Sequence, residues 1–251
     1  MCSEYICGAS LRQVRVGYIS SDLSLTWWMG QLYDRAVQRL RLRFSRGPEL
    51  KYISHLDLMR LWERALRRGE IPLVYSEGYS PHPRISLAAP LSIGMTSEAE
   101  LMDLTVDGSA SAHSVMRGIR PQLPLGLDIL EIWHALLTAP SLQSQLRYAE
   151  YRVEVPWENG GEEMRMAVDS LMHTRELPWR HMRDTGPRLY DLRALIGGIW
   201  LEEGDALTYV LGMRLRCGPQ GTGRPEQVTA ALGVKEHPLS IHRTKLLLAE
   251  S

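Results

Sequence analysis

Residues 39–69 read RLRLRFSRGPELKYISHLDLMRLWERALRRG and carry the clearest structural signals of the chain. The first six residues of this stretch alternate arginine with an apolar side chain, which is typical of a strand that buries one face. The next four residues include Gly47 and Pro48 and indicate a turn. We therefore predict a strand at 39–44 that leads through a turn into the rest of the stretch.

The second part of this stretch predicts a helix over 54–69. Apolar residues recur at intervals of four from Leu58 to Leu66, so they would share one face of a helix. Ser54 and Asp57 have the S-x-x-D spacing of a capping box. Gly69, the last residue of this range, is a typical signal for the end of a helix.

Outward from this stretch, the sequence continues an α+β pattern. Further strands are expected at 85–89, 100–107 and 127–133, with a helix at 111–120. Together with the first strand and helix, these elements give the order β-α-β-β-α-β, which is the split-βαβ order of ferredoxin-like folds.

The second half of the chain repeats this order of elements without repeating the sequence. The expected elements are strands at 151–155, 189–201, 207–216 and 241–248 and helices at 161–173 and 225–232. The predicted fold class is therefore α+β, with two tandem ferredoxin-like (βαββαβ) units.

Domain boundaries follow from these elements. The first unit is expected to cover 39–137 and the second 138–251, with a polar joint at 138–147. Residues 1–38 show no clear periodicity and are interpreted as an N-terminal extension. This extension is either poorly ordered or, if translation starts at Met29, largely not made.

Composition excludes several classes of protein. Hydrophobic residues make up 44% and charged residues 23%, which excludes a wholly disordered or collagen-like chain. The 29 basic and 29 acidic residues exclude a generally basic coat for nucleic acid, although 39–94 has a net charge of +5 and 95–169 one of −7. No apolar run is long enough to span a membrane and no signal peptide is recognisable, so we predict a cytoplasmic protein without membrane contact.

Residues 75–84, YSEGYSPHPR, form the densest cluster of functional side chains. Prolines on both sides of His82 stiffen the backbone there. A rigid loop that presents His82 and Arg84, with Tyr75 and Tyr79 nearby, suits an anion attached to a flat ring. The alternative is a plain connection between two strands.

The start of the first helix offers a second set of candidates, His55, Asp57 and Arg60. A helix N-terminus attracts anions, although capping alone explains Asp57. In another interpretation, His55 and His82 form an acid–base pair, and the protein is an enzyme in its own right.

A glycine-rich loop at 216–225, RCGPQGTGRP, contributes Gly221, Thr222 and Arg224 as candidates for phosphate binding. The P-loop ending is absent, so a plain turn is the alternative. Polar insertions in expected strands add four more candidates, Asp191, Arg193, His242 and Arg243. No His or Cys spacing typical of a metal site occurs, and none is predicted.

Several of these blocks resemble one bacterial family. They are RLRF at 41–44, SHLDLMR at 54–60, YSEGYSPHPRIS at 75–86, APSLQ at 139–143, YDLR at 190–193, GTGRP at 221–225 and IHRT at 241–244. Over about residues 39–248 the chain is similar to the radical SAM-associated, or radical SAM-linked, protein family of unknown function.

The resemblance implies a partner and a class of substrate. In that family the domain is fused to, or encoded beside, a radical SAM protein, often near genes of RNA processing. This chain lacks a C-x-x-x-C-x-x-C motif. The resemblance therefore implies no cofactor on this chain, with the iron–sulfur cluster and S-adenosylmethionine on a separately encoded radical SAM protein.

Three functions are consistent with the sequence. The first is a substrate-binding or accessory module for RNA modification, which would use His82, Arg84, Arg224 and Arg243 as contacts. The second is a structural partner subunit of the radical SAM protein. The third is an independent enzyme that uses the two histidines described above. The basic segment at 39–94 and the two loops favour the first.

Overall fold

The structure is a computed structural model, and it describes residues 37–249 except 109, 184–185 and 205–206. The expected N-terminal extension therefore lies outside the described residues, apart from its last two positions. The same holds for the alternative start at Met29.

The first half of the described chain contains the predicted order of elements. They are β1 (Gln38–Arg46), α2 (His55–Arg68), β2 (Ile85–Leu87), β3 (Thr96–Val106), α3 (Ala112–Ile119) and β4 (Leu127–Ala135). All of its strand pairs are antiparallel, in the order β4-β1-β3-β2. The predicted strand at 39–44 and helix at 54–69 are thus confirmed.

Apolar residues alternate with arginine along β1, and the apolar ones form part of the core of this half. Leu40, Leu42 and Phe44 are fully buried, and they pack against the apolar face of α2. The ring of Phe44 meets the edge of Trp62 at 5.0 Å between centroids. The helix begins where the capping residues predict, because the Ser54 hydroxyl accepts a hydrogen bond from the Asp57 amide at 3.1 Å.

The second half contains more elements than the sequence predicts. They are α4 (Leu142–Gln145), β5 (Leu146–Pro156), α5 (Gly161–His173), β6 (Pro178–Arg183), β7 (Gly186–Asp191), β8 (Ile196–Gly204), β9 (Thr208–Gly218), β10 (Gly221–Thr222), α6 (Pro225–Ala231) and β11 (Ser240–Leu248). The helix expected at 161–173 has the predicted bounds.

The single strand expected at 189–201 is wrong. The chain turns at Asp191, because its carboxylate accepts hydrogen bonds from the backbone amides of Leu177 and Arg193 at 2.8 and 3.0 Å. One short strand, β7, therefore ends there, and β8 begins five residues later after a 3-10 turn. Strand β7 pairs with β6 in a separate two-stranded hairpin that the sequence did not reveal.

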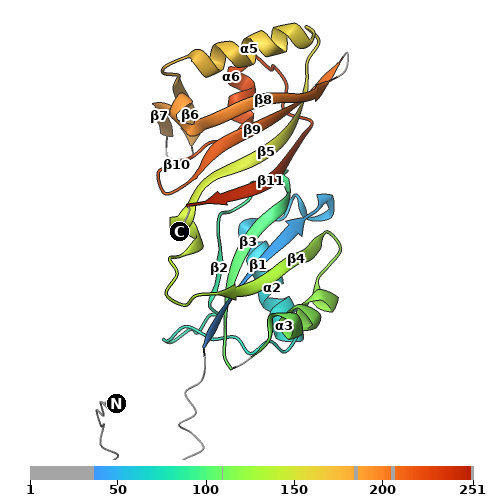
Figure 1. Cartoon of the computed structure of the whole chain (residues 1–251), viewed down its shortest axis with the longest axis vertical. Coiled ribbons are helices and arrows are strands. Elements are labelled where there is room, and N and C mark those ends of the chain that lie inside the picture. Colours follow the sequence, from blue (N-terminus) through green and yellow to red (C-terminus); the bar gives the residue numbers. More distant parts are fainter. Residues whose placement is uncertain (1–36, 109, 184–185, 205–206, 250–251) are drawn as a thin grey trace, which may run out of the picture. The chain divides into compact units, whose positions relative to one another are not determined.

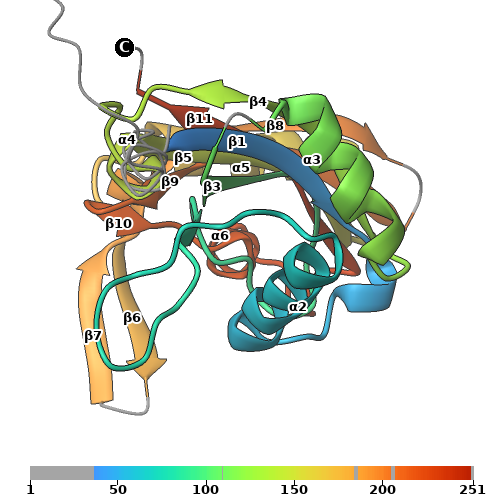
Figure 2. The same cartoon turned by 90° about the horizontal axis from the view of Figure 1, so that it is seen from below.

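The other described strands join in one nine-stranded sheet with the order β10-β9-β5-β11-β3-β1-β4, in which β2 pairs with β3 and β8 with β9. Figure 1 shows β11 between β5 and β3. Figure 2 shows α2, α6 and the β6–β7 hairpin on the same side of the strands. The fold is α+β and dominated by this sheet, and its division into tandem ferredoxin-like units stays a prediction.

The two halves of the sheet meet along a short seam. Strands β11 and β3 are parallel, and they pair only through His242 with Thr96 and Arg243 with Ser97. The seam thus has few backbone contacts, and side chains must add to its stability.

A buried ion pair crosses this seam. The Arg243 guanidinium donates hydrogen bonds to Glu100 at 3.0 and 3.3 Å, and the two side chains are 3% and 2% exposed. It also donates to the Pro90 carbonyl at 3.2 Å. Burial alone would lower the pKa of Arg243, but the charge of Glu100 and the phenol of Tyr151 raise it more, so the net shift is upward.

A second buried arginine lies close to this pair. Arg46 is fully buried, and its guanidinium donates to four backbone carbonyls, those of Leu50, Lys51, Ile53 and Leu91. Burial, opposed by Glu100 and reinforced by Arg243, lowers the pKa of Arg46. Glu100 is therefore the counter-charge for two buried cations.

We expect Glu100→Gln to destabilise the protein by about 3 kcal/mol or more, because it leaves buried guanidinium charge without its carboxylate. Urea denaturation measures the loss. Glu162→Gln is the matched control: it removes an exposed carboxylate that pairs with Arg165 at 3.2 Å, and we expect a change below about 1 kcal/mol. Equal losses in the two variants would contradict the role of the seam pair.

Candidate functional site

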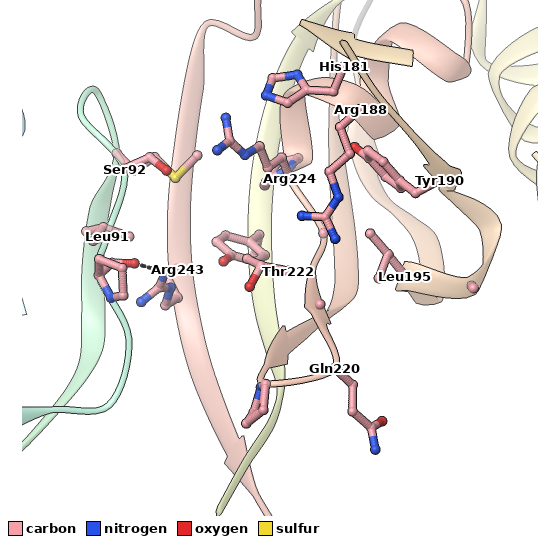
Figure 3. A pocket seen from close by; sticks show the side chains of 18 of the residues that line it. Leu91, Ser92, His181, Arg188, Tyr190, Leu195, Gln220, Thr222, Arg224 and Arg243 are labelled. Atoms are coloured by element: carbon pink, nitrogen blue, oxygen red, sulfur yellow. Dashed lines mark hydrogen bonds between the residues drawn. The ribbon is translucent and has the colours of Figure 1, made fainter. Parts of the chain in front are cut away.

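A cavity of about 650 Å³ lies beside the seam, and we call it the hairpin cavity. Its walls come from the loop between β2 and β3, the β6–β7 hairpin, the glycine-rich loop after β9, and strands β5 and β11. Figure 3 shows Leu91 and Ser92 on one side, facing Arg188, Tyr190 and Leu195 on the other. The cavity therefore exists only where both halves of the sheet meet.

The hairpin presents one face of functional side chains to the cavity. His181 pairs with Arg188 across the two strands, and Tyr190 lies two residues further along β7. These three side chains consequently share a face. The Arg188 guanidinium lies 6.0 Å from the centre of the Tyr190 ring, and the Tyr190 hydroxyl donates to the Gln227 side chain at 2.5 Å. The tyrosine ring is thus held in a fixed position.

The glycine-rich loop brings Thr222 and Arg224 to the cavity. Gly221 has a φ of +140°, and a Cβ there would lie 2.8 Å from the Leu195 side chain. Glycine therefore permits both the turn and its close approach to the wall. The Gly223 amide donates to the Arg216 carbonyl at 2.8 Å and closes the loop.

The deepest part of the wall is formed by Arg243 and Tyr151. The Arg243 guanidinium lies 5.5 Å from the centre of the Tyr151 ring. Burial raises the pKa of Tyr151, so its phenol stays protonated at neutral pH. Arg243 Nε is buried and has no hydrogen-bond partner, which leaves one donor unsatisfied beside the cavity.

The described residues that line the cavity carry net positive charge. Arg188 and Arg224 are exposed, and neither has a carboxylate partner among the described residues. Among the described residues of the wall, Asp191 is the one acidic residue, and its Oδ1 accepts hydrogen bonds from two backbone amides. The arrangement can hold an anion with two arginine forks and a flat ring against Tyr190.

Five of the predicted site residues line this cavity: Asp191, Gly221, Thr222, Arg224 and Arg243. Arg193 does not, because its guanidinium donates to the carbonyls of Met172 and Ile196 and fixes the base of the hairpin. His242 also lies elsewhere. Its Nδ1 is 2.8 Å from the Thr96 hydroxyl.

The predicted residues of the first half do not line the hairpin cavity. They are His55, Asp57, Arg60, Tyr75, Tyr79, His82 and Arg84. Asp57 lies in the first turn of α2, where its amide donates to the Ser54 hydroxyl and its carboxylate pairs with Arg60 at 3.3 Å, and Tyr79 is fully exposed. No hydrogen bond joins His55 to His82 in the described chain, and Arg84 lines a different pocket.

The sequence missed His181, Arg188 and Tyr190. Arginine and tyrosine two residues apart in a short strand are the signal that was available. The strand expected at 189–201 includes Tyr190 but neither Arg188 nor His181, so it does not predict the β6–β7 hairpin that brings the three side chains together.

A family model decides which family this chain belongs to. The model described as "Uncharacterized protein conserved in bacteria" (DUF2344) matches residues 39–225. The chain belongs to this family. The hairpin cavity of this DUF2344 protein draws on residues inside the matched range and on Arg243 beyond it. No curated protein matches the chain.

Solved structures resemble the chain only distantly. A Cbf5-Nop10-Gar1 complex has a TM-score of 0.47 and 11% identity, and the match covers 82% of this chain and 48% of that one. An H/ACA RNP bound to a substrate RNA has a TM-score of 0.44 and 10% identity, covering 82% and 47%. This chain therefore spans about half the length of either match, and we draw nothing about function from them.

His242 gives a prediction for pH dependence. Burial lowers its pKa below the ordinary value of 6.5, with Arg152 acting in the same direction and Glu98 opposing. The unfolded chain therefore takes up the proton more readily. The stability that the neutral ring contributes is present above pH 6.5 and is lost as the pH falls below it.

We expect the wild-type protein to lose more unfolding free energy than His242→Gln between about pH 8 and pH 5.5, because only in the wild type does unfolding release a half-buried ring that takes up a proton more readily in the unfolded chain. Urea denaturation at each pH measures the difference. Parallel pH profiles for the two proteins would contradict the prediction.

Proposed function

We propose that this protein is an RNA-binding accessory module that holds a substrate for a separately encoded radical SAM enzyme. The observation that carries the proposal is the hairpin cavity, in which Arg188 and Arg224 have no carboxylate partner among the described residues and lie beside the fixed ring of Tyr190. The cluster and S-adenosylmethionine would belong to the partner enzyme.

The chemistry of the cavity supports a nucleotide unit as its occupant. Single-stranded RNA offers a phosphate beside a splayed base, and proteins bind such units with arginine forks and aromatic stacking. Arg188 and Arg224 match the phosphate, and Tyr190 and His181 match the base. A volume of about 650 Å³ falls in the usual range of ligand sites.

The sheet supports the finer description of the fold. The first half has the strand order β4-β1-β3-β2, and the second has β11-β5-β9-β8 with antiparallel neighbours throughout. We propose that both are ferredoxin-like units that share one sheet, with the β6–β7 hairpin inserted in the second.

We expect Arg188→Gln and Arg224→Gln each to weaken the binding of total bacterial RNA by about tenfold, because each loses charge-assisted hydrogen bonds to phosphate. Filter binding across a salt series measures the affinity. The wild type should show a steep salt dependence, and each variant a shallower slope.

Arg165→Gln is the matched control for these variants. It removes an equal charge from the exposed surface of α5, where Arg165 pairs with Glu162, and it should leave RNA affinity unchanged. The proposal fails if the cavity variants bind RNA as tightly as this control.

An apolar surface favours the structural-partner alternative. Trp133, Leu136 and Leu137 at the end of β4 are 38%, 75% and 52% exposed. Exposed apolar groups of this size are typical of protein contacts. If the partner role is primary, Leu136→Asp should abolish co-purification with the radical SAM protein, and the cavity variants should not.

A further inference from the structure

A second, smaller pocket of about 200 Å³ lies on the face of the sheet opposite the core of the first half. Strand register assembles it: Arg39 pairs with Thr105, and Ser86 pairs with Asp103. Because Leu40 and its alternate neighbours on β1 point into the core, Arg39 must point to the other face. We call this site the Arg84 pocket, after the arginine at its rim.

The arginines on this face differ in their partners. Arg41 forms a two-pronged ion pair with Asp103 at 2.7 and 3.0 Å, which neutralises the one carboxylate in the pocket. Arg43 pairs with Glu131 at 2.9 Å. These two arginines thus contribute no net charge to the surface.

Arg39 and Arg84 are not neutralised in this way. Arg39 donates to the Ala139 carbonyl at 2.7 Å, which satisfies one N–H but leaves the charge. The Arg84 side chain is exposed and has no hydrogen bond or ion pair with any other described residue. Both guanidiniums line the same pocket, so it carries net positive charge.

We propose that the Arg84 pocket binds a phosphate group. Two guanidiniums supply charge and paired N–H donors, and the hydroxyls of Ser86, Thr105 and Ser141 line the same space. This site goes beyond the proposed function, since it shares no residue with the hairpin cavity. The phosphate belongs either to an RNA backbone or to a phosphorylated small molecule.

Inorganic phosphate is the first probe. In a ¹H–¹⁵N NMR titration of the full chain, we expect the amide signals of Ser86 and Thr105 to shift and saturate. Arg84→Gln should raise the fitted Kd about tenfold, because it removes a charge-assisted contact. Arg84→Lys keeps the charge without the fork and should fall between the two.

Arg165→Gln again controls for the loss of one positive charge, and it should match the wild type. Arg84 is exposed, so its variants are expected to keep the wild-type spectrum outside the pocket. Equal phosphate affinity in Arg84→Gln and Arg165→Gln would overturn the proposal, whatever the variants of the hairpin cavity do.

RNA binding then identifies the source of the phosphate. A salt slope that falls by about 0.7 in Arg84→Gln supports a backbone phosphate of single-stranded RNA. An unchanged slope, together with weakened phosphate binding, supports a phosphorylated small molecule. Both results support the site itself, and neither depends on Arg188 or Arg224.

Discussion

The ion pair of Arg243 with Glu100 holds the two halves of the sheet together at the seam between β11 and β3. Two charges are withdrawn from water there, and each is tolerated only because the other is within hydrogen-bonding distance. The pair therefore requires β11 and β3 to meet in one register. The same guanidinium binds the Pro90 carbonyl and forms part of the wall of the hairpin cavity. The seam and the candidate site therefore share Arg243.

The elements that the sequence predicts well are those whose signals are local. The alternation of β1 and the capping residues of α2 lie within a few positions of the structure they specify. The break after β7 is different, because the Asp191 carboxylate stops the strand by binding the amide of Leu177, fourteen residues earlier in the chain. The residues next to Asp191 in the sequence do not predict this long-range contact.

The sequence predicted some residues of the candidate site but not that they lie together. The glycine-rich loop and the polar residues of β11 pointed to Arg224 and Arg243 as separate candidates. Their convergence with Arg188 depends on the hairpin, and the opposite wall depends on a seam that joins residues 143 positions apart. The most distinctive block of the sequence, at 75–84, instead leads to the Arg84 pocket, which alternation on β1 helps to build.

The position of β11 has a consequence for synthesis of the chain. It comes last among the described strands, yet it lies inside the sheet between β5 and β3. Until residues 240–248 have been translated, the edge of β5 that faces β11 has no partner strand, whereas β3 lacks only the pairings of Thr96 and Ser97. Bare strand edges of this kind invite pairing with other chains. A nascent chain stalled shortly before β11 would thus expose the long unpaired edge of β5, where aggregation would begin.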